Sequence, residues 1–284
     1  MSKSRLIPFL LLVAASLQSC LKNDVNPDEA KYAENQQEIQ QYIAKNNLQM
    51  QSTNSGLYYQ VLKSNPAGKT AQKGSQVVMS FVGRLTNGNV FDSAQANEDR
   101  FIRFPFNVSA TLPGLDEMAG LLKEGDSARV IMPSNLGLGS REYNKVPAYS
   151  VLVFNLSLKK TQTEDEALQD YARRKKYPDA IKTASGLYYT ITKKDTTGIP
   201  VSGKQKATVT YKGMYLDGSV FDAGTATFDI NGVVPGFTEG LKLMRTKEKA
   251  VFMMPSALAY GQKGYDRIPP FSPLVFEVEV TGTQ

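Results

Sequence analysis

The side chains that most often carry out catalysis are scarce in this chain of 284 residues. Histidine does not occur, and Cys20 is the one cysteine, so no disulfide can form within the chain. Zinc sites need several histidine or cysteine ligands, and the common nucleophilic triads need a histidine base. The composition therefore excludes both kinds of site. Tyrosine hydroxyls and carboxylates remain, and several of them belong to a repeated pattern.

Short motifs recur in the same order in the two halves of the chain. SGLYY and VFD recur after 130 residues, and MPS and LVF recur after 122. One net loss of eight residues between Asp222 and Pro235 explains the change in spacing. Collinear matches of this extent indicate a tandem duplication, and each copy has the size of an ordinary domain. The motifs are SGLYY at 55–59 and 185–189, VFD at 90–92 and 220–222, MPS at 132–134 and 254–256, and LVF at 152–154 and 274–276.

The second copy has the clearer pattern of secondary structure. Leu168 and Tyr171 are spaced for one face of a helix that opens this copy. Phe237, Leu241 and Met244 have the spacing of a second, shorter helix that begins with a proline. Alternating apolar residues predict strands, and an Asp-Gly turn predicts that the chain folds back. The predicted fold class is α+β, an antiparallel sheet covered by one short helix. The expected strands are 185–194, 207–214, 249–254 and 274–280.

The order and spacing of these motifs over 205–282 resemble the FKBP-type peptidyl-prolyl cis-trans isomerases. The first copy resembles the same family more weakly, over 75–160. The family fold is a curled antiparallel β-sheet wrapped around a short α-helix, with an apolar cleft between them. The resemblance implies two tandem FKBP-like domains at 36–160 and 161–284, each preceded by an N-terminal helix. The segments that carry it are VTYKGMYLDGSVFD (209–222), VVPGF (233–237), LAYG (258–261), IPP (268–270) and LVFEVEV (274–280).

The resemblance implies an intact site in the second copy. Tyr260 would donate a hydrogen bond to the substrate carbonyl, and Phe237 would form the cleft floor, where the family usually has Trp. That departure bears on the binding of macrolide inhibitors more than on catalysis. Asp222 has two open roles, ordering the pocket through Tyr211 or receiving a C–H contact. The implied catalytic residues are Tyr211, Phe221, Asp222, Tyr260 and Phe276, and the implied substrate-binding residues are Phe228, Val233, Val234, Phe237 and Ile268.

The first copy departs from the family pattern at the same positions. Leu115 stands in place of the aromatic floor, and Leu138 and Phe81 stand in place of the two tyrosines at the rim. An insertion at 97–103 alters the same edge. We therefore expect a degenerate cleft with weak or no turnover. Its residues are Phe81, Phe91, Asp92, Leu115, Leu138, Val146 and Phe154.

Prolyl isomerisation is chemistry that this composition permits. Twisting a peptide bond costs about 18–20 kcal/mol because resonance is lost, but no bond is made or broken. The reaction therefore needs no nucleophile, metal or cofactor. An apolar cleft removes the water that favours the planar amide, and a placed donor holds the carbonyl, so the twisted form is bound preferentially.

The predicted function is an FKBP-type isomerase that acts on proline-containing polypeptides. The second copy is the expected catalyst, and the first is a substrate-binding or docking module. A non-catalytic alternative stays open, in which the chain is a chaperone or an accessory subunit of an outer-membrane complex. The loss of site residues in the first copy keeps that alternative in view.

The N-terminus has the parts of a secretory signal, namely a basic start, an apolar run and small residues before Cys20. LQSC at 17–20 resembles the lipobox of bacterial lipoproteins, which implies lipidation of Cys20 and membrane anchoring. The expected layout is a signal peptide at 1–20 and a polar tether at 21–35. Together with the paired domains, it resembles the FKBP lipoproteins of Bacteroidetes-type bacteria. The expected location is the cell envelope, with the outer membrane preferred and its face left open.

The net charge of +6 does not indicate a nucleic-acid partner. The 33 basic residues are scattered, and the longest basic run, at 173–176, is expected on the solvated face of a helix. A nucleic-acid binder would need a basic stripe, and a secretory signal argues against that class of protein.

Overall fold

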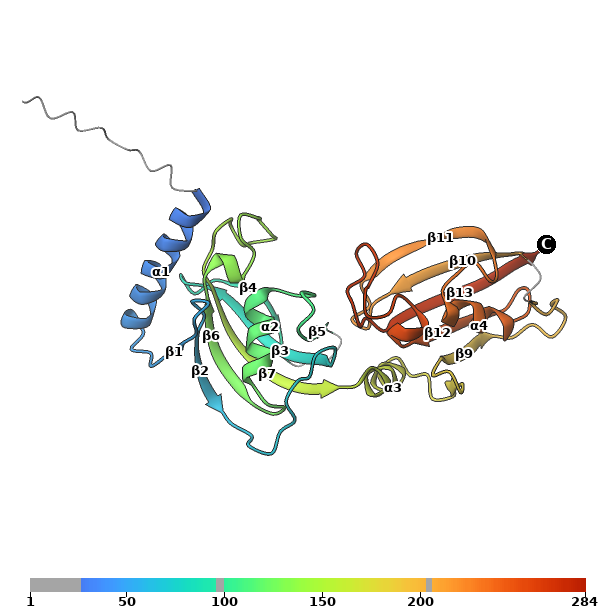
Figure 1. Ribbon diagram of the computed structural model, residues 1–284, viewed down its shortest axis with the longest axis horizontal. Coiled ribbons are helices and arrows are strands. Elements are labelled where there is room, and N and C mark those ends of the chain that lie inside the picture. Colours follow the sequence, from blue (N-terminus) through green and yellow to red (C-terminus); the bar gives the residue numbers. More distant parts are fainter. Residues whose placement is uncertain (1–26, 96–99, 203–205) are drawn as a thin grey trace, which may run out of the picture.

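Each copy of the repeat folds into its own sheet domain, as the computed structural model shows (Figure 1). The structure describes residues 27–95, 100–202 and 206–284. We call residues 27–162 domain 1 and residues 163–284 domain 2, because the last strand of the first copy ends at Gln162. The predicted signal peptide and Cys20 lie outside the described residues.

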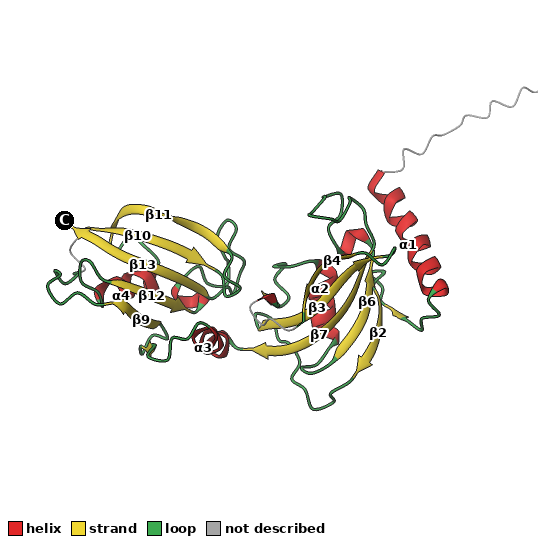
Figure 2. Cartoon of the chain, turned by 180° about the vertical axis from the view of Figure 1, so that it is seen from behind, coloured by secondary structure: helices red, strands yellow, loops and turns green. Residues whose placement is uncertain are grey.

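Within its described residues, domain 2 forms a six-stranded sheet in the order β11-β10-β13-β12-β9-β8, and all neighbouring strands are antiparallel. The helix α4 lies along one face of this sheet (Figure 2). This arrangement confirms the predicted α+β class. The elements are α3 (Glu164–Arg174), β8 (Ile181–Lys182), β9 (Tyr188–Lys193), β10 (Lys206–Met214), β11 (Val220–Asp229), α4 (Pro235–Lys242), β12 (Lys249–Met254), η3 (Ser256–Leu258) and β13 (Leu274–Thr283).

Domain 1 repeats this layout, with a seven-stranded sheet in its described part, in the order β1-β2-β6-β7-β3-β4 and with β5 also paired to β3. The long edge strand β11 of domain 2 is replaced here by two shorter strands, β4 and β5. The expected insertion at 97–103 falls at this division, and its residues 97–99 lie outside the described part. The elements are α1 (Pro27–Lys45), β1 (Gln51–Ser52), β2 (Tyr58–Lys63), β3 (Gln76–Leu85), β4 (Val90–Ala94), β5 (Ile102–Pro105), α2 (Pro113–Leu121), β6 (Ser127–Met132), η2 (Ser134–Leu136) and β7 (Leu152–Gln162).

Both faces of the domain 2 sheet are buried around the start of β13. Phe276 belongs to the core under α4, while Val275 packs with Leu168 and Tyr171 of α3 on the opposite face. Burying one such aliphatic side chain contributes about 1.5–3 kcal/mol. The alternation in the sequence predicted one buried face for this strand, and the second is buried because the preceding helix covers it. In domain 1, Ile39 of α1 covers the corresponding face of the sheet by packing against Ile131 and Val153.

The first helix begins earlier than the sequence suggested. The expected tether at 21–35 is too long, because α1 starts at Pro27 and its residues 27–35 are helical. Most side chains of these polar residues are exposed, but Asn35 is buried and donates to the carbonyl of Tyr149. No helix in the described ranges combines the length and the apolar character needed to span a membrane.

The two domains are joined without a flexible linker. Thr163 follows β7 directly and caps α3, since its hydroxyl accepts from the Glu166 amide at 3.2 Å and the Glu166 carboxylate accepts from the Thr163 amide at 2.8 Å. Such a reciprocal cap satisfies two backbone donors at the start of a helix. The turn from strand to helix is therefore fixed by local hydrogen bonds.

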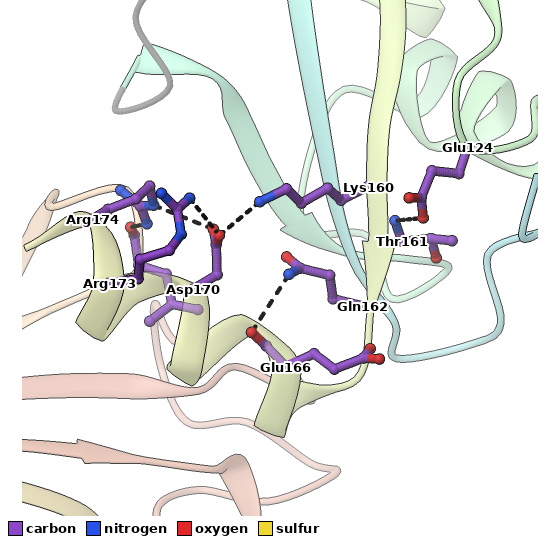
Figure 3. A network of polar contacts seen from close by, with 9 residues as sticks. Glu124, Lys160, Thr161, Gln162, Glu166, Asp170, Arg173 and Arg174 are labelled. Carbon is purple, nitrogen blue, oxygen red and sulfur yellow. Dashed lines mark hydrogen bonds and ion pairs between the residues drawn. The ribbon is translucent and has the colours of Figure 1, made fainter. Parts of the chain in front are cut away.

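An ion-pair network ties α3 to the last strand of domain 1 (Figure 3). Lys160 donates to Asp170 at 2.6 Å, and Arg173 and Arg174 donate to the same carboxylate at 2.9 and 3.3 Å. Burial by itself would raise the pKa of Asp170, but the hydrogen bonds from Lys160 and Arg173 outweigh it and leave that pKa lowered. The sequence expectation of a solvated basic run is wrong for Arg174, whose side chain is 5% exposed because it pairs with Asp170.

Candidate functional site

A cleft of about 340 Å³ lies between α4 and the sheet of domain 2. Eight of the ten residues that the resemblance assigned to this site line it, so the structure brings together segments from four separate parts of the copy. The lining residues are Tyr211, Asp222, Phe228, Gly232, Val233, Val234, Phe237, Tyr260, Tyr265 and Phe276.

Phe237 forms the floor of the cleft and is 4% exposed. Its ring centre lies 5.1 Å from that of Phe276, 6.1 Å from that of Phe228 and 6.4 Å from that of Tyr211, with the planes close to perpendicular. Edge-to-face pairs of this kind contribute about 0.5–1.5 kcal/mol each beyond the area they bury. The floor is therefore a rigid apolar surface on which a prolyl ring can rest.

The start of α4 places backbone groups beside this floor. Val234 is the residue before the helix, and its carbonyl accepts from the amides of Phe237 and Thr238, both at 3.0 Å. Pro235 occupies the first turn, where the missing N–H costs no helical hydrogen bond. Val233 and Val234 are half-buried and line the cleft.

Two tyrosine hydroxyls are the main donors on the cleft wall. Tyr211 donates to Asp222 at 2.8 Å. Burial and then the Asp222 carboxylate raise the pKa of Tyr211 above its ordinary value. Burial, followed by the charge of Asp222, also raises the pKa of Tyr260. Both phenols therefore keep their protons at neutral pH and remain able to donate.

Tyr265 belongs to the cleft but was missed by the sequence prediction. Its ring stacks on Tyr260, with centres 5.4 Å apart and planes inclined by 14°. It lies in the exposed loop between η3 and β13, and 68% of its surface is accessible. Tyr265 lies five residues after Tyr260 in the sequence, and this short separation could have indicated it. The loop folds back there, because Tyr265 and Ile268 exchange backbone hydrogen bonds.

Phe221 and Ile268 do not line the cleft, although the sequence assigned them to it. Phe221 packs beside the cleft residue Phe276, 5.7 Å away between ring centres, and lies 5.3 Å from Tyr215. Its ring lies over Gly213, where an added Cβ would come within 2.6 Å of the ring. Ile268 is buried in the core against which Tyr260 packs. Both residues therefore pack against residues that line the cleft.

The corresponding site of domain 1 has lost its polar rim. Leu115 is 2% exposed, and Phe81, Val146 and Phe154 are also buried in the domain 1 core. Phe91 and Leu138 are partly buried and pack against that core. Phe81 has no hydroxyl, so Asp92 cannot form the contact seen in domain 2. Instead Asp92 accepts from Arg100 at 2.6 Å, a residue of the insertion.

Neither site is suited to a metal ion. In the described part of the chain no group of three or more histidine, cysteine or carboxylate side chains converges. In domain 2 the arrangement instead offers an apolar cavity with hydroxyl donors, which can bind a peptide segment and hold one carbonyl.

Comparison with known proteins identifies the class to which this fold and site belong. A family model described as FKBP-type peptidyl-prolyl cis-trans isomerase matches residues 67–159 and 198–281. These stretches cover more than half of the chain, so the chain belongs to the FKBP-type peptidyl-prolyl cis-trans isomerase family. The predicted family and the two tandem FKBP-like domains are confirmed.

Several relatives from bacteria are similar to this chain. The FKBP-type 22 kDa peptidyl-prolyl cis-trans isomerase of Escherichia coli is 30% identical over 67% of this chain and 96% of its own length. The probable isomerase FkpA of Neisseria meningitidis is 42% identical over 36% of this chain and 40% of its own length. The crystal structure of FkpA from Escherichia coli matches at 31% identity and a TM-score of 0.40, covering 43% of this chain and 59% of that one. The chain thus spans less than half the length of some curated relatives that it matches.

Proposed function

We propose that domain 2 catalyses cis-trans isomerisation of Xaa-Pro bonds in polypeptides. The observation that carries this proposal is the cleft in which an apolar floor at Phe237 meets the hydroxyl of Tyr260 at the rim. Catalysis of prolyl isomerisation requires that the twisted amide be bound more tightly than the planar one, and such a cleft can bind it in that way.

In this proposal, each step of the reaction uses a surface or a hydrogen bond of the cleft. The prolyl ring rests on Phe237 and Phe276, which removes water from the amide that must twist. Tyr260 donates to the substrate carbonyl and holds it while the C–N bond rotates. Asp222 orients the wall through the hydrogen bond from Tyr211, at 2.8 Å. This contact supports the first of the two roles that the sequence left open for Asp222, positioning through Tyr211.

Domain 1 acts as a substrate-binding or docking module in this proposal. Its floor is Leu115 and its rim has Leu138 and Phe81 in place of tyrosines, so a substrate carbonyl meets no hydroxyl at these positions. The carboxylate of Asp92 is engaged by Arg100. Such a surface can bind apolar segments, but it has no hydroxyl donor at these positions to stabilise a twisted amide.

The chain acts at the cell envelope in this proposal, held by lipid on Cys20 and assisting the folding of exported proteins. The support is the sequence of the first 20 residues, with its basic start, apolar run and LQSC motif. The outer membrane is the preferred location. The alternative, a non-catalytic chaperone or accessory subunit of an outer-membrane complex, uses the same anchor.

The test is catalysed exchange of Xaa-Pro peptides by the two-domain chain from residue 21 onward. Tyr260→Leu, which copies Leu138 of domain 1, should lower kcat/KM by about tenfold or more, because a donor to the reacting carbonyl is lost. The matched control is Tyr143→Leu, an exposed tyrosine at the position in domain 1 that corresponds to Tyr265. If the unaltered chain does not accelerate exchange in peptides that differ in the residue before proline, the enzyme proposal is wrong and the non-catalytic alternative takes its place.

A further inference from the structure

The active-site loop of domain 2 is held by a side chain of domain 1. This loop, residues 259–273, carries Tyr260 and Tyr265 and lies at the end of domain 2 that faces domain 1 (Figure 1). Gln76, the first residue of β3, donates from its side-chain amide to the carbonyl of Phe271 at 2.8 Å. Gln76 is 6% exposed, and its hydrogen bond to the other domain is partly buried.

Phe271 connects this contact to the catalytic edge of the loop. Its φ of 56° lies in the left-handed region, which a phenylalanine seldom adopts without support. Its amide donates to the carbonyl of Gly261 at 3.0 Å, next to Tyr260. Its ring covers Gly74 of domain 1, where an added Cβ would lie 2.8 Å from the ring. Domain 1 therefore contacts Phe271 through both its carbonyl and its ring.

Domain 1 holds the corresponding loop of its own in a different way. Tyr149 matches Phe271, with φ of 58° and an amide that donates to Gly139 at 2.8 Å. Its carbonyl accepts from the side-chain amide of Asn35 at 2.9 Å, and its hydroxyl donates to Asp28 at 2.5 Å. Both partners lie on α1, the helix of the same domain.

Domain 2 has lost this internal donor. Glu164 occupies the place of Asn35, because its carboxylate accepts from the Ser256 amide and hydroxyl at 2.5 and 2.7 Å, as the Asn35 oxygen accepts from the Ser134 amide at 2.8 Å. An ionised carboxylate has no hydrogen to give to the Phe271 carbonyl. The donor is supplied instead by Gln76 of the neighbouring domain, 195 residues away in sequence.

We propose that Gln76 is a positioning residue for the domain 2 site, so that the activity of the second copy depends on the first. This inference rests on the proposed function, since it assumes that domain 2 is the catalyst. Exposed loops open locally at small free-energy cost, and a donor held slightly out of place loses much of its effect. The contact with Gln76 keeps the stretch from Tyr260 to Phe271 in one conformation.

The first experiment compares kcat/KM of the two-domain chain with that of Gln76→Met, which keeps the side-chain volume and removes the donor. We expect a loss of about three- to tenfold, the range of the one hydrogen bond that reaches domain 2. The same amide also donates to the Gly74 carbonyl of domain 1 at 3.2 Å. Gln72→Ala is the matched control, because Gln72 is an exposed glutamine of domain 1 whose side chain, among the described residues, bonds to Thr70 alone.

A rescue variant separates positioning from a general loss of structure. Adding Glu164→Asn to Gln76→Met gives domain 2 the same residue that holds Tyr149 in domain 1. The asparagine can donate to Phe271 and accept from Ser256, so kcat/KM should return to within about twofold of the original. A loss caused by a damaged domain 1 would not be repaired from α3.

Hydrogen exchange gives a result that does not depend on activity. The amide of Phe271 should exchange about three- to tenfold faster in Gln76→Met and return to its original rate in the double variant. An unchanged exchange rate with unchanged kcat/KM would overturn the inference and leave the isomerase proposal intact. An inactive chain whose Phe271 exchange still responds to Gln76 would overturn the proposed function and retain the contact.

Discussion

The hydroxyl of Tyr211 donates to Oδ2 of Asp222 at 2.8 Å, across the strands β10 and β11 that form one wall of the cleft. In domain 1 the same two positions are Phe81 and Asp92, and Asp92 pairs with Arg100 instead. A neutral donor therefore holds the carboxylate in one copy and a cation in the other. Two sheets with the same topology thus present different electrostatics at the same edge.

Tyr211→Phe should lower kcat/KM by about three- to tenfold while changing the free energy of unfolding by less than about 1 kcal/mol. The contact is exposed, so water replaces it at little cost to stability, but the carboxylate loses its fixed orientation beside the cleft. The measurement is peptide isomerisation together with urea unfolding. Tyr189→Phe, on the same sheet and outside the cleft lining, is the control and should leave both values unchanged. Equal kcat/KM in both variants would rule out the role of Asp222 through Tyr211 and leave the C–H contact as its other role.

Activity should stay constant into the alkaline range. In the proposed mechanism the neutral phenol of Tyr260 is the donor, and its pKa is raised by burial and by the charge of Asp222. A raised pKa means that the donor form persists above the ordinary value of about 10. We therefore expect kcat/KM of the unaltered chain to be constant from about pH 6 to pH 9.5. The kcat/KM of Tyr260→Phe should be lower by the same factor at every pH in this range. A decline of the unaltered chain centred below about pH 9 would show that another group controls the rate.

Much of this site could be predicted because its residues lie in strong local patterns. Phe237 follows a proline and has helical spacing with Leu241, and Phe276 belongs to an alternating strand, so the floor follows from periodicity and the family motifs. The prediction of a tether up to residue 35 was wrong because α1 starts with polar, exposed turns that have no apolar periodicity. Polar composition alone does not separate a solvated helix from an extended segment.

Contacts between distant segments could not be predicted from spacing. Gln76 reads as an ordinary polar residue at the start of a strand, and its bond to Phe271 depends on how the two domains are docked. Arg174 belongs to a basic run, yet the carboxylate of Asp170 and the carbonyl of Leu216 make it a buried residue. Phe221 was assigned to the lining because the motif contains it, whereas in the structure its ring packs over Gly213 and beside Phe276.

Phe237→Leu should convert the floor of domain 2 into that of domain 1. The smaller side chain loses ring contacts with Phe276 and Phe228 and leaves space in a closely packed core, so we expect a destabilisation of about 1–2 kcal/mol. It should also lower kcat/KM by about tenfold, because the prolyl ring loses its support. The reciprocal variant, Leu115→Phe, should leave activity unchanged, since the tyrosines of the rim are still missing there. A gain of activity in Leu115→Phe would show that the floor alone limits domain 1.

Asp170→Asn should weaken the junction between the domains in a way that depends on pH. Asp170 is 8% exposed, and its carboxylate accepts from Lys160 of β7 and from Arg173 and Arg174 of its own helix. Replacing it leaves the buried Arg174 without its anion, so we expect a loss of about 1–3 kcal/mol at neutral pH.

The direction of the pH effect follows from the lowered pKa of Asp170. A carboxyl group with a lowered pKa in the folded state stabilises that state at pH values above its ordinary pKa of 3.8, and the contribution disappears as the pH falls through the lower, folded value. Urea unfolding should therefore show a constant difference between the two proteins from about pH 5 to pH 8 and a shrinking one below about pH 4. Asp165→Asn is the matched control on the same helix, because its partner Lys182 is 45% exposed and exposed pairs contribute about 0–1 kcal/mol. A difference for Asp170→Asn that stayed the same down to about pH 3 would mean that packing, and not the charge of Asp170, holds α3 against β7.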